Sequence, residues 1–270
     1  MRYNLLIDGK VMSIPNHYEK SLRLFSQRGV LELGRHVLRV ERANTWLQHI
    51  LSIQEAIYRI DDYFEDNKEL SYQALKRMWN DVETAISEAD VLPIEHCWTS
   101  FCRLRLYEST EKRIHEGDLI DPREYQQIVS LKVSDVAIAR SLIWSYAGYT
   151  PSNQDYRFWS IFDECGELIE DLQDLAEDVA CWNFNFWLYT YMAGGPLISG
   201  ALSAEDTLRQ RLHQLELAYS QLSGESVQAS KSPFPKMMKA GKRTLNVEWP
   251  ARLISIRSRL QRYSQVPLSP

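Results

Sequence analysis

From Tyr18 onward, apolar residues recur at intervals of three and four positions, which is the period of one face of an α-helix. Glycine and proline interrupt this pattern at only a few places, namely Pro93, Gly117 to Pro122, Gly148 to Pro151, Gly194 to Pro196 and Ser232 to Pro235. The segments between these breaks predict helices of roughly 15 to 30 residues, longer than the average of about 11 to 12. The pattern therefore predicts an all-α fold.

The N-terminal segment departs from this helical pattern. Asp8-Gly9 stands between two short apolar runs, which is a signal for a tight hairpin turn. We therefore expect residues 2–14 to form a small β-ribbon or an extended arm, within an N-terminal unit of residues 1–17. No internal repeat or change of composition divides residues 18–270, so we expect them to form a single helical domain.

The composition is that of an ordinary folded protein. The 270 residues are 44% hydrophobic and 25% charged, enough to bury a substantial core. A formal net charge of −5 gives no general case for nucleic-acid binding, which usually needs a basic excess. The N-terminus lacks the features of a signal peptide, and no stretch approaches the roughly eighteen apolar residues of a membrane span. We therefore expect a cytoplasmic protein without a transmembrane segment or a nucleic-acid partner.

The cysteines and aromatic residues leave the chemistry open. Cys97, Cys102, Cys165 and Cys181 form no CxxC pair, and no histidine stands at a spacing that would complete a zinc site. We interpret all four as reduced core residues. The eight tryptophans and fourteen tyrosines either fill the core or line a deep apolar cavity, and the sequence fits both interpretations.

The first segment with candidate chemistry is residues 57–66, which reads as a helix. At about 100° per residue, apolar side chains including Ile57 and Ile60 fall on one side and acidic side chains on the other. The acidic residues are Asp61, Asp62, Glu65 and Asp66. A face of this kind fits metal binding and also fits a plain solvated surface.

A second acidic segment, residues 163–178, carries carboxylates at intervals of three and four residues. This stripe consists of Asp163, Glu167, Glu170, Asp174 and Asp178. Like charges at this spacing repel by roughly 0.2–0.5 kcal/mol per pair, and no lysine or arginine lies between Arg157 and Arg209 to offset the repulsion. Cations from elsewhere must relieve it, and magnesium suits carboxylate oxygens. A purely structural acidic stripe is the alternative.

The two acidic helices and the basic residues 231–262 together indicate diphosphate chemistry. Metal ions held by carboxylates would grip an anionic diphosphate, and basic side chains would neutralise its remaining charge. Stabilisation of a departing diphosphate is a large catalytic term, because negative charge develops there as the bond breaks. Aromatic rings suit the carbocation left behind, through cation–π contacts in a cavity without water.

On these residues the chain resembles the class I isoprenoid synthases, the helical superfamily of terpene cyclases, squalene and phytoene synthases and trans-prenyltransferases. Residues 56–66 resemble the first aspartate-rich motif of that superfamily, which implies that its four acids are magnesium ligands. Glu170, Asp174 and Asp178 have the i, i+4, i+8 spacing of the second metal-binding triad of the cyclases, but an all-acidic triad departs from the usual pattern. Glu170 and Asp171, followed by Asp174, also resemble the second DDxxD motif of the prenyltransferases.

Further residues resemble those that contact the substrate in members of this superfamily. Lys132 heads a run, ending at Arg140, that resembles the prenyltransferase segment whose lysine contacts diphosphate, and Arg140 is an alternative for that role. Asn185 and Phe186 resemble an Asn-Phe pair of large bacterial cyclases. The resemblance implies substrate binding by Arg140, Asn185 and Phe186, and a catalytic role for Lys132 and for a C-terminal pair that resembles the Arg-Tyr pair of bacterial cyclases, Arg262 and Tyr263. Trp182 is a further candidate for substrate binding, as part of the lining of a hydrocarbon pocket.

The hypothesis from sequence is a magnesium-dependent terpene synthase, a lyase that ionises an allylic prenyl diphosphate. The resemblance implies three magnesium ions and an all-α, single-domain bundle around a central cavity. The chain lacks the N-terminal Gly-Lys-Arg segment of chain-elongating prenyltransferases, which favours cyclisation or elimination over condensation. A prenyltransferase or squalene/phytoene-type synthase and a non-catalytic helical binding protein stay open as alternatives, and the sequence does not decide between a monomer and a homodimer.

Overall fold

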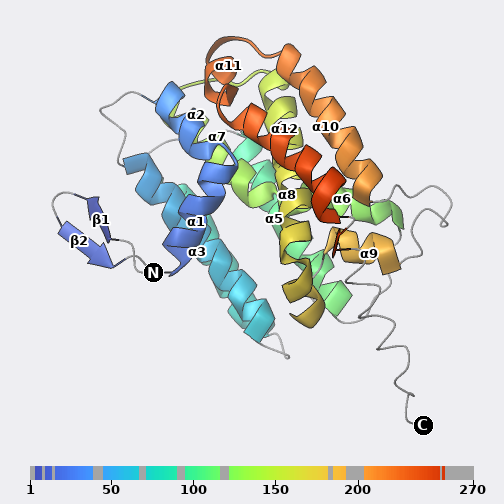
Figure 1. Ribbon diagram of the computed structural model, residues 1–270. Helices are drawn as coiled ribbons and strands as arrows, with labels where there is room; N and C mark the ends of the chain where they lie inside the picture. The colour runs from blue at the N-terminus through green and yellow to red at the C-terminus, as the bar shows by residue number, and fades with distance from the viewer. Residues whose placement is uncertain are drawn as a thin grey trace, which may run out of the picture.

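The structure is a computed structural model that describes residues 4–7, 10–13, 16–38, 45–66, 71–89, 95–115, 122–181, 185–192, 204–249 and 251–252. A short hairpin precedes a series of helices (Figure 1). The elements are β1 (Asn4–Ile7), β2 (Lys10–Ser13), α1 (Asn16–Gln27), α2 (Val30–Val37), α3 (Thr45–Asp66), α4 (Tyr72–Ser87), α5 (Glu95–His115), α6 (Pro122–Lys132), α7 (Ser134–Ala147), α8 (Asn153–Cys181), α9 (Phe186–Met192), α10 (Ala204–Ser220), α11 (Gly224–Ser230), α12 (Pro233–Arg243) and the π-helix η3 (Thr244–Glu248). The predicted all-α class is confirmed for the described residues, apart from the hairpin.

The hairpin lies where the Asp8-Gly9 pattern predicts it. β1 and β2 pair antiparallel, with Asn4 opposite Ser13 and Ile7 opposite Lys10. This register leaves the two residues Asp8 and Gly9 as the connection, and both lie outside the described residues. The arm ends at the start of α1, so it is a local unit of β-structure on a helical chain.

Glycine and proline end the helices close to the predicted breaks. α7 stops at Gly148, whose φ of 62° is left-handed and whose N–H donates to the carbonyl of Ser145. α12 begins with Pro233 in its first turn, where the missing N–H costs no hydrogen bond. These local signals explain the end of α7 and the start of α12 at predicted breaks, whereas α8 ends at Cys181, before the break predicted at Gly194 to Pro196.

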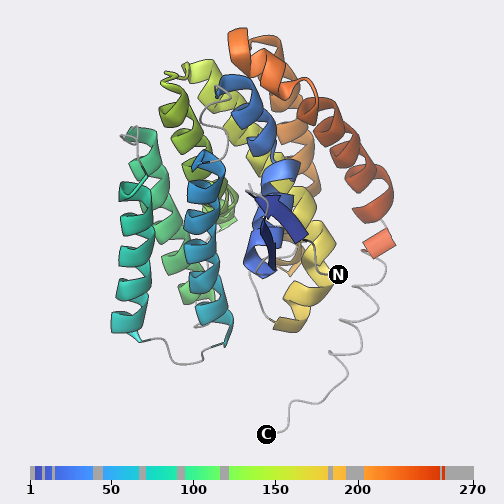
Figure 2. The same cartoon turned by 90° about the vertical axis from the view of Figure 1, so that its left-hand side faces the viewer.

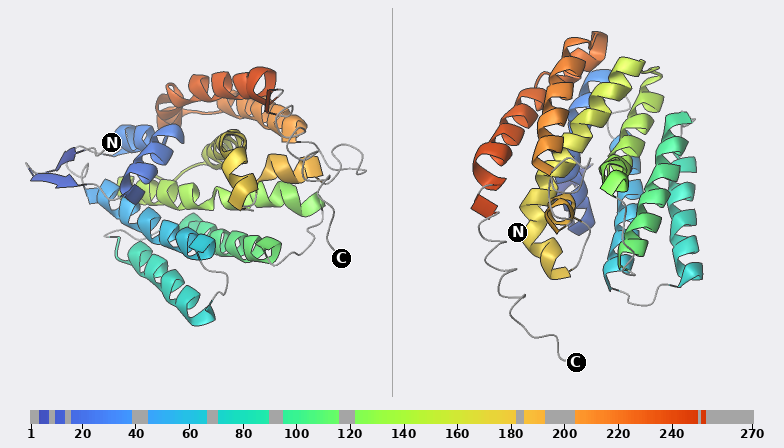
Figure 3. Two further views of the ribbon diagram at one scale, coloured as in Figure 1. Left: turned by 60° about the horizontal axis from the view of Figure 1, so that its bottom comes forward. Right: turned by 90° about the vertical axis from the view of Figure 1, so that its right-hand side faces the viewer.

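α8 lies at the centre of the molecule, as the nearly end-on view in Figure 3 (left) shows. It packs against α6, α9, α10 and α12, whereas α3 packs against α1, α4 and α7, and α5 packs against α6 and α7. Figure 2 shows α4 and α12 at opposite edges of the molecule. None of the described helices combines the length and the apolar character that a bilayer crossing requires.

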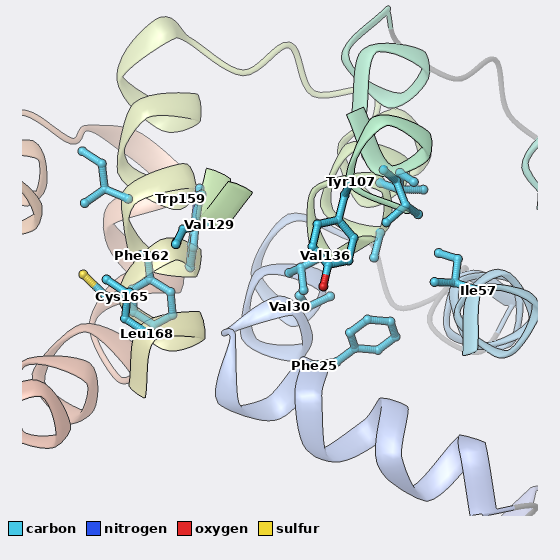
Figure 4. Close-up of a cluster of buried hydrophobic side chains, with 14 of the residues drawn as sticks. Phe25, Val30, Ile57, Tyr107, Val129, Val136, Trp159, Phe162, Cys165 and Leu168 are labelled. Atoms are coloured by element: carbon cyan, nitrogen blue, oxygen red, sulfur yellow. The ribbon is translucent and has the colours of Figure 1, made fainter. Parts of the chain in front are cut away.

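Large aromatic and aliphatic side chains fill the space between α8 and the helices α1, α2, α3, α5 and α7. In Figure 4, Phe162, Cys165 and Leu168 project from α8, while Phe25 and Tyr107 gather opposite them with side chains of α2, α3 and α7. Trp144, Trp159, Trp187 and Phe186 are also fully buried. Core packing is therefore the observed role of most of the described tryptophans.

The cysteines divide into two kinds. Cys97 and Cys165 are buried free thiols, as predicted, and burial raises the pKa of Cys97 to about 12. The prediction that every cysteine lies in the core is wrong for Cys102, which is an exposed free thiol on α5. Its neighbours Phe101 and Leu104 take the buried face of that helix, and Cys102 falls on the opposite one. The side chain of Cys181 lies outside the described residues.

Candidate functional site

The acidic stripe of α8 meets basic side chains that come from distant parts of the chain. Arg28, in the turn between α1 and α2, donates from Nη2 to Glu167 Oε2 at 2.9 Å and to Glu170 Oε2 at 2.6 Å. Lys132, the last residue of α6, lies with Nζ 2.8 Å from Glu167 Oε1 and 2.6 Å from Asp171 Oδ1. Two cations therefore bind three carboxylates of α8, of which Glu167 and Glu170 belong to the acidic stripe and Asp171 stands beside it.

A third cation binds the start of the stripe. Arg140 on α7 donates from Nη2 to both carboxylate oxygens of Asp163, at 2.7 and 3.0 Å, and to the backbone carbonyl of Arg28 at 3.1 Å. Arg28 Nη1 donates in turn to the backbone carbonyl of Asp163. We call this set of residues the α8 network: Arg28, Lys132, Arg140, Asp163, Glu167, Glu170 and Asp171.

Two glycines allow close packing around the α1–α2 turn that carries Arg28. Gly29 adopts a left-handed φ of 66°, and a Cβ at that position would lie 3.0 Å from the ring of Trp159. Gly166 lies under the guanidinium of Arg28, so that any side chain there would collide with it. A glycine in the middle of an acidic helix is thus the local sequence signal that another group approaches the backbone closely.

The α8 network shows that the negative charge on α8 is compensated by basic side chains from other parts of the chain. Burial raises the pKa of Glu167, but the charges of Lys132 and Arg28 outweigh it and hold that pKa below its usual value. Burial raises the pKa of Asp171 to about 7, although Lys132 opposes the rise. Cations from elsewhere do relieve the repulsion, and those the structure provides are side chains. Repulsion along the stripe therefore no longer argues for metal ions there.

A second group of carboxylates surrounds Asp61 on α3, and we call it the acidic cluster: Asp61, Glu108, Glu111 and Asp135. Burial raises the pKa of Asp61 to about 7, Glu111 raises it further, and Lys20 opposes the rise. Burial also holds the pKa of Glu108 well above its usual value, and Asp61 adds to that effect. The two side chains are close enough to share a hydrogen bond when one of them is protonated.

Unlike the stripe, the acidic cluster has unsatisfied oxygens. Neither carboxylate oxygen of Glu108 finds a hydrogen-bond donor within the described part of the chain, although the residue is only 2% exposed. Asp135 is better satisfied, since Oδ2 accepts from Gln54 Nε2 at 2.8 Å and Oδ1 from the N–H of Val136 at 2.6 Å. Burial still raises the pKa of Asp135 to about 6. The cluster therefore favours an added cation or proton.

Two tyrosines connect the acidic cluster with the α8 network. Burial raises the pKa of Tyr58, and the charges of Asp135, Asp61 and Glu170 raise it further. The pKa of Tyr107 is raised by burial and by Glu111, while Lys132 opposes the rise. Each phenol thus senses charges from both groups. Asp61 of α3 and Glu170 of α8 both act on Tyr58, so these two carboxylates lie near the same buried phenol.

The motif residues of α3 behave differently from one another. Asp61 turns into the acidic cluster, whereas the carboxylate of Asp62 is about half exposed and lies 3.0 Å from Nε2 of His17 on α1. The side chains of Glu65 and Asp66 lie outside the described residues. Helical spacing alone groups all four acids, so it overlooked this separation of Asp61 from Asp62.

The Asn-Phe pair after α8 joins α8 to α9. Asn185 is fully buried, and its Nδ2 donates to the carbonyl of Asp171 and, at 2.6 Å, to Asp178 Oδ2. Its Oδ1 accepts from the N–H groups of Trp187 and Leu188, which caps the first turn of α9. The N–H of Phe186 donates to Asp171 Oδ2 at 3.0 Å. The pair therefore holds Asp171 and Asp178 in place and does not depend on a ligand to do so.

Replacing Asn185 by alanine should lower the free energy of unfolding by roughly 2–3 kcal/mol, because a helix cap and a hydrogen bond to a carboxylate are lost together. Asn185→Ser is the matched control, since its hydroxyl can still cap α9 but cannot reach Asp178. Urea denaturation should place the serine variant between wild type and alanine. Equal losses in both variants would contradict the capping role.

The remaining predicted residues are only partly described. Asp174 is exposed on α8, and Trp182, Arg262 and Tyr263 lie outside the described residues. Sequence reasoning missed four residues that the structure brings into the site, namely Arg28, Glu108, Glu111 and Asp135. Gly166 is a signal for the first of these, and no local pattern distinguishes the other three from ordinary surface acids.

Neither a preformed metal-binding arrangement nor a similar protein identifies the function of this site. Within the described ranges, no group of three or more His, Cys, Asp or Glu residues is arranged to hold a metal ion. Comparisons with family models, with curated proteins and with solved structures find no match to this chain. The function must therefore be argued from the site itself.

Proposed function

We propose that this protein is an enzyme of the class I isoprenoid synthase type, which binds an allylic prenyl diphosphate with magnesium and releases diphosphate. The observation that carries the proposal is the acidic cluster with its unsatisfied Glu108, close to two cations: the charge of Lys132 acts on Tyr107 beside the cluster, and that of Arg28 acts on Asp135. A metal–diphosphate complex combines positively charged metal ions, which carboxylates can bind, with negatively charged phosphate oxygens, which arginine and lysine can bind.

The donor chemistry of the acidic cluster suits magnesium, which typically uses only one or two protein carboxylates when substrate phosphates complete its shell. No three acids of the described residues form a ready ligand set, but Asp61 and Glu108 offer hard oxygens, and both oxygens of Glu108 lack a donor among those residues. Magnesium, when bound, would supply positive charge to stabilise the departing diphosphate. Glu167 and Glu170 fit this role less well, because Arg28 already occupies their oxygens.

The side chains of the chain itself would have three tasks. Lys132 and Arg28 would donate to diphosphate oxygens, exchanging their present carboxylate partners for phosphate. Buried aromatic rings, including Phe25 and Tyr107, would keep water from the reacting carbon and face the developing positive charge. Asn185 would hold Asp171 in position while Lys132 changes partner. Cyclisation or elimination then follows inside the cavity, as the missing Gly-Lys-Arg segment favours.

A prenyl-transfer reaction differs only in what captures the cation. A non-catalytic helical protein is the second candidate, and a specific observation favours it. The cations of the α8 network each have a carboxylate within 3.0 Å, so this part of the interior is neutralised without any ligand. In that case the network would serve to hold the helices together and the acidic cluster would carry protons.

Incubation with geranyl, farnesyl and geranylgeranyl diphosphate, each with and without magnesium, tests the proposal. We expect magnesium-dependent release of diphosphate from at least one of them, with a hydrocarbon or alcohol product identified by gas chromatography and mass spectrometry. Product that forms only with an added isoprenoid acceptor would favour the transferase. No release at any chain length would favour the non-catalytic protein.

Lys132→Gln should reduce diphosphate release by about 100-fold, the usual effect of removing one donor that stabilises developing negative charge. Lys76→Gln is the control, because Lys76 is exposed on α4 and belongs to neither the α8 network, the acidic cluster nor the basic residues 231–262. Circular dichroism must show that both variants are folded. Equal activity in the two variants would contradict a role of Lys132 in binding diphosphate.

A further inference from the structure

A separate cavity of about 190 Å³ lies between α5, α6, α7 and α8. Its wall includes Ser100 and Arg103 of α5, Arg140 and Trp144 of α7, and Trp159 of α8. No residue of the acidic cluster lines it. The exposed residues His96, Thr99 and Ser160 also line the cavity, so it reaches the surface of the molecule.

Three side chains that line this cavity carry four buried donor nitrogens that lack an acceptor. They are Nε and Nη1 of Arg140, Nε1 of Trp144 and Nε1 of Trp159. None of them has a hydrogen-bond partner among the residues that the structure describes, and the three side chains are each 2% exposed or less. An unsatisfied buried donor is costly, so native structures usually pair such groups with protein, water or a ligand.

The same wall has almost no negative charge to offer these donors. Asp163 is its only carboxylate, and both of its oxygens already accept from Arg140 Nη2. Arg103 uses Nη2 to bind the backbone carbonyl and hydroxyl of Ser130, and the carboxylate on which its charge acts, Glu164, is outside the cavity lining and already paired with Arg211. Two arginines and one aspartate give the wall a net positive charge. A ligand for this cavity must therefore accept hydrogen bonds and carry negative charge.

We propose that this cavity binds a tetrahedral oxyanion of the phosphate class, whose oxygens accept from Arg140, Trp144 and Trp159. The donors come from two helices, which suits an ion with oxygens in four directions better than a planar carboxylate. The volume equals roughly six waters at about 30 Å³ each, so the cavity holds such an ion with a small group attached. Burial lowers the pKa of Arg140, and a bound anion would counter that effect.

Titration calorimetry and thermal unfolding with sodium phosphate test this site, with sodium chloride at matched ionic strength as the reference. We expect phosphate to release heat and to raise the melting temperature. The double variant Trp144→Phe and Trp159→Phe keeps two aromatic rings but removes both indole donors. It should bind phosphate about 100-fold more weakly, or roughly tenfold for each hydrogen bond to a charged group.

Trp79→Phe provides the matched control, because Trp79 on α4 is also buried but packs against Phe101 of α5 and does not line the cavity. It should bind phosphate as wild type does. The double variant should stay folded, because the donors it loses have no partner in the described protein. Melting curves without phosphate will check this directly.

Three results would overturn the proposal. Phosphate effects no larger than those of chloride would mean that water alone satisfies the donors. Equal phosphate affinity in wild type and the double variant would place the ion elsewhere, and equal affinity for acetate would exclude a tetrahedral ion. Binding of both phosphate and phenyl phosphate would support a phosphorylated ligand, and binding of phosphate alone would support the free ion. None of these results depends on diphosphate release from a prenyl substrate.

Discussion

Replacing Arg28 by methionine should lower the free energy of unfolding by about 3–5 kcal/mol, the usual cost of removing one partner from a buried ion pair. Arg28 is 1% exposed and binds Glu167, Glu170 and the carbonyl of Asp163. Methionine keeps most of the aliphatic stem of Arg28, so the loss should come from the guanidinium, which is the part that lies over Gly166. Equilibrium denaturation in urea, followed by circular dichroism, measures the change.

Arg59→Met is the matched control for this experiment. Arg59 also binds a glutamate, at 2.6 Å, but its side chain is 61% exposed and its partner Glu55 stands four residues away on the same helix. Pairs of that kind are worth about 0.3–0.5 kcal/mol. A loss in Arg28→Met no larger than that in Arg59→Met would show that the buried network contributes little to stability.

Adding Glu170→Gln to the Arg28 variant should recover part of the lost stability, roughly 1–2 kcal/mol, because it removes a carboxylate that has lost its partner. The single variant Glu170→Gln completes the double-mutant cycle. Additive losses would mean that Arg28 and Glu170 do not interact in solution. A positive coupling would assign the loss to the ion pair and not to packing.

The Arg28 network also shows where prediction from sequence ends. Periodicity and the glycine and proline breaks predict the helices, and the spacing predicts the acidic stripe of α8. Arg28 lies 139 positions before Glu167, and its contact depends on how the α1–α2 turn packs against Gly166. Counting local charges could show that the stripe needs cations. It could not show whether those cations are metal ions or side chains of the same chain.

The structure therefore makes the acidic residues of α3, and not those of α8, the better candidates for binding a metal ion. Repulsion made α8 the stronger candidate for metal binding, but the structure neutralises α8 with arginine and lysine. Asp61 looked like one member of an amphipathic face, and it lies instead with Glu108, Glu111 and Asp135. Those partners belong to α5 and α7, and their approach to α3 depends on tertiary packing. Among the described residues, the acidic cluster is therefore the group with the greater need for an added positive charge.

Asp61→Asn should make the protein more stable at pH 8 and less active, with opposite signs from a single substitution. The pKa of Asp61 rises to about 7 from an ordinary value of 3.8, so the folded chain favours the neutral carboxyl. Asparagine mimics that neutral form. We expect a gain on the order of 2 kcal/mol at pH 8 without magnesium, since each pKa unit corresponds to about 1.4 kcal/mol and the remaining hydration reduces the effect.

The dependence on pH gives the sign of this effect. A carboxyl whose pKa is higher in the folded chain than in the unfolded chain favours folding most below the unfolded value, and this advantage is lost as the pH rises through the folded value. Wild type should therefore lose stability between about pH 4 and pH 7, and Asp61→Asn should lose less. The gain from the substitution should be small at pH 5 and largest at pH 8. Asp81→Asn, on the exposed face of α4, should change stability by less than about 0.5 kcal/mol at either pH.

Activity supplies the opposite half of the Asp61 prediction. If the acidic cluster binds the metal of a metal–diphosphate complex, Asp61→Asn should reduce magnesium-dependent diphosphate release by about 100-fold, while Asp81→Asn retains it. If removing the charge of Asp61 makes the protein more stable but abolishes the reaction, then that charge is kept for function at a cost in stability. A stabilised Asp61→Asn variant with full activity would instead make the cluster a structural set of protonated acids. A destabilised variant would show that the carboxylate of Asp61 is favourably paired, contrary to its raised pKa.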